Sequence, residues 1–421
     1  MSKQKLVQRQ KYLDWLKSWR EKQIIKVVAG VRRCGKSTLF KLYIDWLLET
    51  GIKPEQIISI NLEELEYENL LNYRALYDYI IARLYKGGYT YVFIDEVQNC
   101  KDYERAVDSL FVKDNVDLYI TGSNAYMLSG ELATLLSGRY VQISMLPLSF
   151  AEYVTFKGVG EKDLSSTFQT YLRFGAFPAT AMLNKQEDLI RSYLDGIYNS
   201  ILIKDTAVRL GITDISVLTS IAKFLFSNVG SPVSVKKIAD TINSAGRTIS
   251  VNTVDKYLHA LCDSFLFYKA ERYDIRGRQH LKTQGKYYAV DSGLRELLLA
   301  SSTADLGHVL ENTVYLELLR RGAKVNIGKM AEKEIDFVAK DANGTIYYQV
   351  SASVLDGSTL ERELDPLRKI PDHHPKVLLT LDEIPRTANY DGIRQLHIVD
   401  WLLRNIDGDC GISRTCFPVH G

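Results

Sequence analysis

Residues 24–48 read IIKVVAGVRRCGKSTLFKLYIDWLL, and this stretch decides the fold. It opens with a largely apolar run typical of a buried β-strand, and the residues after Lys36 have the spacing of an amphipathic helix. Between them lies Gly30-Val31-Arg32-Arg33-Cys34-Gly35-Lys36-Ser37, which fits the pattern G-x-x-x-x-G-K-[ST]. A strand, a glycine-rich turn and a helix in this order predict a phosphate-binding loop in a parallel α/β domain.

The residue types of this loop suit a nucleoside triphosphate. Glycines let backbone N–H groups converge on phosphate oxygens, and the N-terminus of the following helix adds partial positive charge. Lys36 is expected to reach the β- and γ-phosphates, and the Ser37 hydroxyl to coordinate Mg²⁺. A glycine-rich turn with a chance lysine is the alternative, and the flanking strand and helix argue against it. The sequence thus predicts ATP and Mg²⁺ as ligands, bound by Gly30, Val31, Arg32, Arg33, Cys34, Gly35, Lys36, Ser37 and Thr38.

A second motif, YVFIDEVQ at residues 91–98, is an apolar strand that ends in two carboxylates. Strands of a parallel sheet that are buried on both faces read this way, and ligands bind at their carboxyl ends. We expect Asp95 to support Mg²⁺ through water and Glu96 to act as the catalytic base that polarises the attacking water. The alternative, a strand that simply ends in solvated acids, fits poorly beside the first motif.

A third strand is predicted at residues 116–121, and polar residues follow it. Ser123 and Asn124 are candidates to sense the γ-phosphate or to position the water, with a plain turn as the alternative. Arg139 lies in a loop before the predicted strand VQISML. An arginine there could stabilise transition-state charge in its own or a neighbouring subunit, or it could be an ordinary surface arginine.

Composition sets the bounds on these expectations. A chain of 421 residues predicts two or three domains. No apolar stretch is long enough to cross a bilayer, and the first residues do not read as a signal peptide. The five cysteines are scattered without a CxxC pair, which favours a reducing compartment, the cytoplasm, and argues against a zinc site. Residues 1–36 hold eleven Lys and Arg residues against Asp14 and Glu21, a pattern that suits a polyanion but equally a solvated helix face.

Five segments occur together and in order: GVRRCGKST, YVFIDEVQ, TGSNAYMLSGELATLLSGRY, PLSFAEY (147–153) and YLRFGAFP (171–178). With them the chain resembles the prokaryotic AAA-type, archaeal-ATPase-like P-loop proteins that carry a C-terminal domain of unknown function with a restriction-endonuclease-like fold. The resemblance covers nearly the whole chain except the tail. It implies an α/β fold class with an N-terminal helix at 1–22, an AAA-type P-loop ATPase domain at 23–190, a helical and winged-helix domain at 191–290 and a degenerate PD-(D/E)XK nuclease-like domain at 291–421.

The middle of the chain has the rhythm of a winged helix. Two helices are expected, the second starting near Ser250, followed by a hairpin. The second helix would enter the major groove of double-stranded DNA with Asn252, Lys256 and His259 exposed. Winged helices also serve as lids or subunit contacts, so DNA binding is one of two alternatives. The basic residues predicted on the wing are Lys269, Arg272, Arg276, Arg278, Lys282 and Lys286.

From about residue 303 the pattern changes to helix, strand, strand, helix, with another strand read at residues 345–351. A metal-dependent nuclease of this class uses a Glu from the helix, an Asp at the second strand and a carboxylate-x-lysine pair on the third. Glu311 and Asp336 match the first two, whereas Gln349 replaces the second acid and Ser351 replaces the lysine. Serine carries no positive charge, so the sequence favours a degenerate site kept for binding. Lys333 or Lys376 could substitute for the lysine in space.

Together these patterns predict a Mg²⁺-dependent ATPase that acts as an ATP-driven switch on DNA or on a protein partner. An ATP-regulated metal-dependent nuclease is one alternative, with Glu311, Asp336 and Gln349 as metal ligands. A signalling or chaperone-like ATPase with a protein partner is another. No membrane association is expected, and a homo-oligomer would let Arg139 act in trans.

Overall fold

The computed structural model describes residues 6–125, 136, 138–183, 186–277, 279–299, 306–330 and 333–404, with only the backbone at 280–284. The chain divides into two compact units. The first comprises Met1–Pro147, Ile203–Gly211 and Cys262–Leu266, and the second comprises Leu148–Leu202, Ile212–Leu261 and Phe267–Gly421. The boundaries predicted at residues 190 and 290 both fall within the second unit.

The first unit is built on a five-stranded sheet with the strand order β2-β3-β4-β1-β5. Every pairing in it is parallel, so the carboxyl ends of the strands lie along one edge. The strands predicted before Asp95 and at residues 116–121 are confirmed as β3 and β4. The five strands are β1 (Ile25–Ala29), β2 (Ile57–Asn61), β3 (Thr90–Asp95), β4 (Val116–Gly122) and β5 (Tyr140–Ser144).

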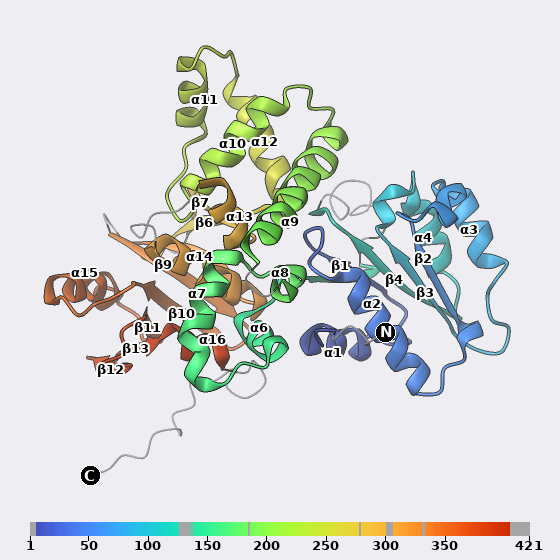
Figure 1. The fold of residues 1–421 in the computed structure, drawn as a ribbon, viewed down its shortest axis with the longest axis horizontal. Helices are drawn as coiled ribbons and strands as arrows, with labels where there is room; N and C mark the ends of the chain where they lie inside the picture. Colours follow the sequence, from blue (N-terminus) through green and yellow to red (C-terminus); the bar gives the residue numbers. More distant parts are fainter. Residues whose placement is uncertain are drawn as a thin grey trace, which may run out of the picture. The chain divides into compact units, whose positions relative to one another are not determined.

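Alternating side chains of β3 show how the sheet is covered on both faces. Val92 and Ile94 belong to a core that residues of α3 and α4 complete. Phe93 faces the opposite side, with its ring centroid 5.2 Å from that of Phe40 on α2 and 4.7 Å from that of Tyr119. Helices therefore lie on both faces of the strands (Figure 1). They are α1 (Gln10–Ser18), α2 (Lys36–Glu49), α3 (Tyr73–Ile81) and α4 (Tyr103–Phe111).

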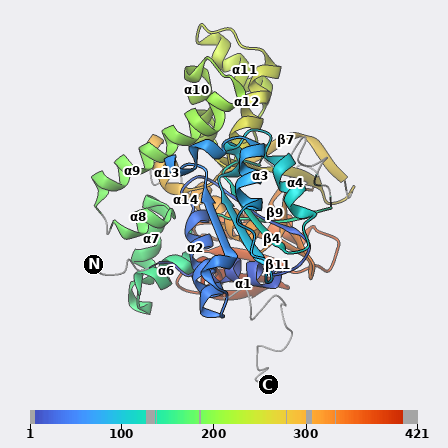
Figure 2. The same ribbon diagram turned by 90° about the vertical axis from the view of Figure 1, so that its right-hand side faces the viewer.

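Helices dominate the first part of the second unit. α10, α11 and α12 lie together in both views (Figures 1 and 2). The start predicted for the second of the two middle helices is confirmed, since the Ser250 hydroxyl accepts a bond of 3.1 Å from the Thr253 N–H at the start of α12. The helices here are α6 (Phe150–Lys157), α7 (Leu164–Phe174), α8 (Pro178–Met182), α9 (Glu187–Ser200), α10 (Ile215–Ser227), α11 (Val235–Ser244), α12 (Val251–Asp263) and α13 (Ser292–Leu299).

The rest of the second unit is an eight-stranded sheet with the order β12-β13-β11-β10-β9-β8-β6-β7. The predicted helix around Glu311 and the three strands after it are confirmed as α14, β8, β9 and β10. The hairpin β6–β7, predicted as the wing, joins this same sheet because β6 pairs in parallel with β8. The elements are β6 (Phe267–Asp274), β7 (Gln279–Ala289), α14 (Leu306–Arg320), β8 (Lys324–Met330), β9 (Lys333–Asp341), β10 (Gly344–Val350), α15 (Gly357–Arg368), β11 (Lys376–Thr380), β12 (Thr387–Tyr390), β13 (Ile393–His397) and α16 (Ile398–Leu403).

Candidate active site

The loop between β1 and α2 has a backbone that only some residues tolerate. Gly35 has a φ of 108° and Arg33 a φ of 68°, both in the left-handed region. A Cβ at Gly30 would lie 2.2 Å from the carbonyl oxygen of Met145, so a side chain cannot fit there. α2 begins at Lys36, which places the positive end of its dipole against the loop. This is the geometry of an anion site at a helix N-terminus.

Lys36 and Glu96 face each other inside this site. The Lys36 Nζ lies 3.1 Å from Glu96 Oε1 and donates to the carbonyl oxygen of Gly30 at 3.0 Å. Both side chains are buried. Burial by itself raises the pKa of Glu96, but the charge of Lys36, with help from Gln98 and Arg32, outweighs it and lowers the pKa to about 2. Glu96 is therefore ionised at neutral pH.

Asp95 lies one residue earlier, at the end of β3. Its Oδ1 accepts a bond from the Thr121 hydroxyl on the neighbouring strand β4, and Ser37 also donates to it. Burial raises the pKa of Asp95, and the bonds from Ser37 and Thr121 oppose that shift. A hydroxyl at the start of α2 and a carboxylate at the end of β3 are thus in contact, which is the ligand pair that Mg²⁺ takes when it arrives with a nucleotide.

The residues predicted to sense phosphate are buried near Glu96. Ser123 accepts a bond from the Gln98 amide at 3.2 Å, and the same amide donates to Glu96 Oε2 at 2.5 Å. Asn124 donates to the backbone oxygen of Asp205 at 3.3 Å. Gln98 was not predicted as a site residue, although its place two residues after Glu96 is a signal that could have found it. It links Glu96 to Ser123, the residue that follows β4.

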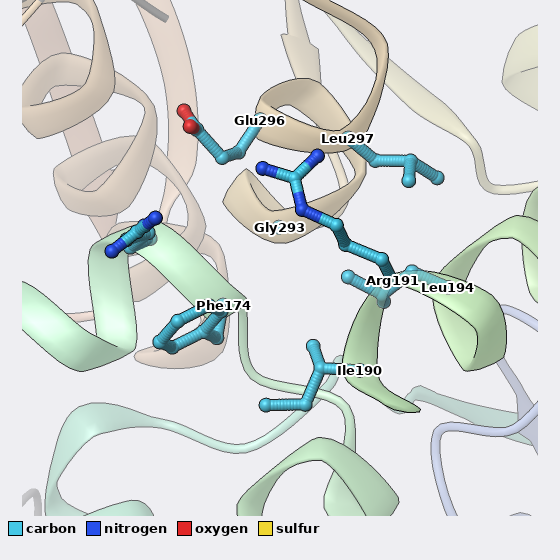
Figure 3. A pocket seen from close by; sticks show the side chains of 8 residues that line it. Phe174, Ile190, Arg191, Leu194, Gly293, Glu296 and Leu297 are labelled. Carbon is cyan, nitrogen blue, oxygen red and sulfur yellow. The ribbon is translucent and has the colours of Figure 1, made fainter. Parts of the chain in front are cut away.

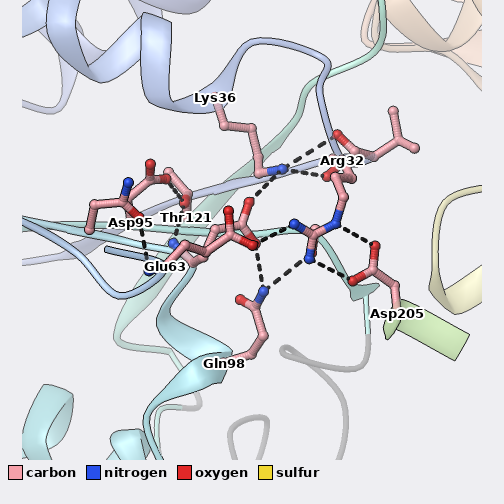
Figure 4. Close-up of polar contacts among 12 residues, drawn as sticks. Arg32, Lys36, Glu63, Asp95, Gln98, Thr121 and Asp205 are labelled. Atoms are coloured by element: carbon pink, nitrogen blue, oxygen red, sulfur yellow. Dashed lines mark hydrogen bonds and ion pairs between the residues drawn. The ribbon is translucent and has the colours of Figure 1, made fainter. Parts of the chain in front are cut away.

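A salt-bridge cluster on the phosphate-binding loop was also missed (Figure 4). Arg32 donates from Nε to Asp205 Oδ2 at 3.0 Å and from Nη2 to Asp205 Oδ1 at 2.9 Å. Its Nη1 donates to Glu63 Oε1. Asp205 lies in the π-helix Ile201–Val208, more than 170 residues from Arg32 in sequence. No pattern in the sequence around Asp205 predicts this contact with Arg32.

Arg139 lies at the opposite edge of the sheet from the loop. Its carbonyl oxygen accepts a bond from Ile25 at the start of β1, whereas the loop follows the end of β1. Its guanidinium pairs with Asp108 of α4. This placement favours two of the alternatives, an ordinary surface arginine or action in a neighbouring subunit, over action in its own subunit, because residues before a parallel strand lie at its amino end. Action in a neighbouring subunit stays a prediction.

The predicted nuclease residues are brought together in the second unit. Asp336 Oδ2 accepts a bond of 2.8 Å from the backbone N–H of Val350. The Gln349 Oε1 accepts from the backbone N–H of Asp336 at 3.3 Å, and its amide donates to Glu363 at 2.8 Å. Glu311 is buried beside them.

A lysine supplies the cation of this cluster. The Lys286 Nζ lies 3.0 Å from Glu311 Oε1 and 2.6 Å from Glu334 Oε1. Burial raises the pKa of Asp336 well above its usual value, the charge of Glu311 adds to this, and Lys286 opposes it. Within the described ranges, no group of three His, Cys, Asp or Glu side chains is arranged to hold a metal ion. Because the Lys286 ammonium faces Glu311, the predicted ligands do not fit a divalent metal in this arrangement.

The basic residues predicted to contact DNA differ in the exposure of their side chains. Lys256 and Arg276 are exposed, and Arg272 is partly buried. The prediction that Lys286 contacts DNA phosphate is wrong, because this side chain is only 4% exposed and faces Glu311. The apolar run KYYAV that it opens was a signal of burial. Arg278 and the side chain of Lys282 lie outside the described residues.

None of the helices in the described residues is both long and apolar enough to span a membrane. A pocket in the second unit contains no predicted site residue (Figure 3). It is lined by Arg173, Phe174, Ile190, Arg191, Leu194, Gly293, Glu296 and Leu297.

Comparisons with known proteins concern the domains and the fold of the chain. The model of an AAA domain matches residues 22–154, and a domain of unknown function, DUF8612, matches residues 165–305. Among solved structures, the Walker-type ATPase PABY2304 of Pyrococcus abyssi is similar with a TM-score of 0.50 and 14% identity, over 70% of this chain and 96% of that chain. At this identity the likeness concerns the fold alone, which is that of a P-loop ATPase.

Two curated relatives match over most of their length. An uncharacterized protein of Haemophilus influenzae is 40% identical over 402 residues, which is 95% of this chain and 99% of the relative. The uncharacterized protein MJ1544 of Methanocaldococcus jannaschii is 30% identical over 366 residues, which is 82% of this chain and 78% of the relative. The chain, an AAA-domain protein with a P-loop ATPase fold, thus belongs to the family of these two proteins.

Proposed function

We propose that this protein binds MgATP at the loop Gly30–Ser37 and hydrolyses it to ADP and phosphate. The observation that carries the proposal is the contact between Lys36 and an ionised Glu96 at the carboxyl edge of the sheet. In this proposal Lys36 binds the phosphates and Glu96 is the base for the attacking water, and the two side chains lie 3.1 Å apart. Ser37 and Asp95, which are joined by a hydrogen bond, are the pair for Mg²⁺.

The arrangement supports a simple sequence of events. When the nucleotide enters, its phosphates take Lys36 away from Glu96, because a phosphate carries more charge than one carboxylate. Glu96 then accepts a proton from the attacking water, while Gln98 holds its second oxygen in place. The backbone N–H groups of the loop and the start of α2 bind the phosphate oxygens. The chain thus positions the water and stabilises charge, which is what phosphoryl transfer needs.

The test is steady-state ATP hydrolysis with Mg²⁺, measured together with nucleotide affinity. Lys36→Ala should lose binding, because it removes the cation for the phosphates. Glu96→Gln keeps the size of the base but cannot take the proton. It should bind ATP as the wild type does and lose roughly 10²- to 10⁴-fold in kcat. Hydrolysis by Glu96→Gln at the wild-type rate would show that Glu96 is not the base.

The same assay examines the predicted partner. Lys256 and Arg276 are exposed, which supports contact with the phosphates of double-stranded DNA. Turnover is therefore measured with and without a DNA duplex at low and at high salt. A stimulation that disappears at high salt and in Lys256→Ala would assign DNA as the partner. Turnover indifferent to DNA at low salt would direct the search to a protein partner.

A further inference from the structure

The phosphate-binding loop carries a cation besides Lys36, and a distant segment holds it. Asp205 clamps the guanidinium of Arg32 through two parallel bonds of 3.0 and 2.9 Å. This fork-to-fork geometry orients a guanidinium more strictly than a single bond does. The side chain of Arg32 is 13% exposed and that of Asp205 is 8% exposed, so solvent screens the pair weakly.

The guanidinium lies within the electrostatic reach of the reacting groups. Burial raises the pKa of Asp205 and Arg32 opposes that rise, and the charges of Glu96 and Lys36 also act on this carboxylate, so the pair lies within electrostatic range of both residues. Arg32 belongs to the loop that surrounds the phosphates, two residues after Gly30 and four before Lys36. Arg32 is therefore a second cation, besides Lys36, on the loop that the proposed function assigns to the phosphates.

The position of Asp205 is itself determined on both sides. Its carboxylate accepts hydrogen bonds from the Arg32 guanidinium, and its backbone oxygen accepts one from the side-chain amide of Asn124, which follows β4. The segment Ile201–Val208 is a π-helix, a rare form that recurs at functional sites. Glu63, after β2, accepts a further bond from Arg32. Three parts of the chain besides the loop itself thus fix the direction of one arginine.

We propose that Arg32 is a catalytic residue that stabilises the transition state of ATP hydrolysis within its own subunit, and that Asp205 is its positioning residue. In the step, the water oxygen bonds to the γ-phosphorus, and the bond from that phosphorus to the β–γ bridging oxygen breaks. The proton of the water goes to Glu96, and ADP leaves with the bridging oxygen. Negative charge builds on the bridging and γ oxygens, where a guanidinium N–H can bind it. This role rests on the proposed function. It assigns to Arg32 the stabilisation of transition-state charge that the sequence had suggested for Arg139.

The variants separate this role from a structural one. Arg32→Ala removes the cation, and Arg32→Lys keeps the charge without the planar fork. Asp205→Asn keeps the shape of the positioning residue without its charge, and Asp205→Glu restores the carboxylate. Lys204→Ala changes the exposed neighbour of Asp205 and is the matched control. For each protein, kcat and KM for MgATP, the Kd of a fluorescent ATP analogue and the melting temperature are measured.

We expect Arg32→Ala to lower kcat by about 100-fold or more while the Kd of the analogue changes less than roughly threefold, since the charge acts mainly on the transition state. Arg32→Lys should recover little. Asp205→Asn should lower kcat by about tenfold with KM nearly unchanged, and Asp205→Glu should recover part of that loss. Lys204→Ala should match the wild type.

The outcomes that overturn the proposal are distinct. If Arg32→Ala or Asp205→Asn retains the wild-type kcat, the ion pair of Arg32 and Asp205 has only a structural role. The same conclusion follows if kcat falls only in those variants whose melting temperature also falls. In that case Lys36→Ala would still abolish activity, and the proposed function would stand. If instead the wild type shows no turnover above Lys36→Ala, the proposed function fails, and this inference fails with it.

Discussion

Lys286 is the cation that compensates the buried acids of the second unit, and Lys286→Met is predicted to destabilise that unit strongly. The ammonium lies 3.0 Å from Glu311, whose side chain is 10% exposed, and 2.6 Å from Glu334, whose side chain is 32% exposed. Methionine fills a similar volume but leaves Glu311 and the neighbouring Asp336 without the positive charge that faces them.

The expected cost follows from these distances. At an effective dielectric constant of about 20, two unit charges 3.0 Å apart attract by roughly 5 kcal/mol. Burying the lysine costs part of that, and the more exposed Glu334 contributes less because water screens it. Breaking one partner of a buried ion pair costs about 3–5 kcal/mol, which is our expectation for Lys286→Met. For a unit of this size that corresponds to a loss of roughly 6–20 °C in melting temperature.

The assay is urea and thermal unfolding of the full chain at neutral pH. Lys324→Met, at an exposed lysine of the same sheet, is the matched control and should change stability by less than about 0.5 kcal/mol. Lys286→Met with Glu311→Gln should recover part of the loss, because the acid no longer needs a partner. The reasoning would be refuted if Lys286→Met were as stable as the control. It would also be refuted if millimolar Mn²⁺ without nucleotide stabilised the wild type by several degrees and Asp336→Asn abolished that gain, since the cluster would then be a metal site.

Three further predictions concern stability and binding. Burial raises the pKa of Asp291 to about 6, although it accepts the N–H of Ala176. The folded state then binds the extra proton, so the contribution of Asp291 is present below about pH 4 and is lost as pH rises through 6. Relative to Asp291→Asn, wild-type stability in urea unfolding should fall by about 3 kcal/mol over that window. Lys26 forms an ion pair with Asp117 at the centre of the first sheet, and both side chains are fully buried. Lys26→Met should therefore lower the free energy of unfolding, measured by calorimetry, by about 3–5 kcal/mol. The loss should be far smaller when Lys26→Met is combined with Asp117→Asn. Gly30→Ala would place a Cβ 2.2 Å from a carbonyl oxygen and should abolish ATP binding measured by fluorescence titration.

Much of the first unit could be predicted because its signals are local. The glycines of the loop, the apolar run of β3 and the acids that follow it each lie within about eight consecutive residues. Parallel strands bring their carboxyl ends to one edge, so the meeting of Lys36, Asp95 and Glu96 followed from the order of those segments alone. The helix and the three strands of the C-terminal part were likewise readable from their periodicity.

Pairings between distant strands decide the places of both Arg139 and Lys286. Action of Arg139 in its own subunit was one alternative because it lies in a loop, but its strand β5 runs parallel to β1, which puts that loop at the amino end. Lys286 was assigned to a wing because its hairpin is basic. The pairing of β6 with β8 brings the hairpin into the C-terminal sheet, where Lys286 reaches Glu311.

The sequence by itself determined the chemistry of the phosphate loop, since glycine conformations, a lysine and a helix start are properties of adjacent residues. Only the tertiary structure decided which charges meet. Asp205 reaches Arg32 across more than 170 residues, and Lys286 fills the acid cluster in place of the missing lysine of β10. Charge neutralisation in a buried site depends on distance in space, and the strand order that sets this distance is decided by packing over the whole unit.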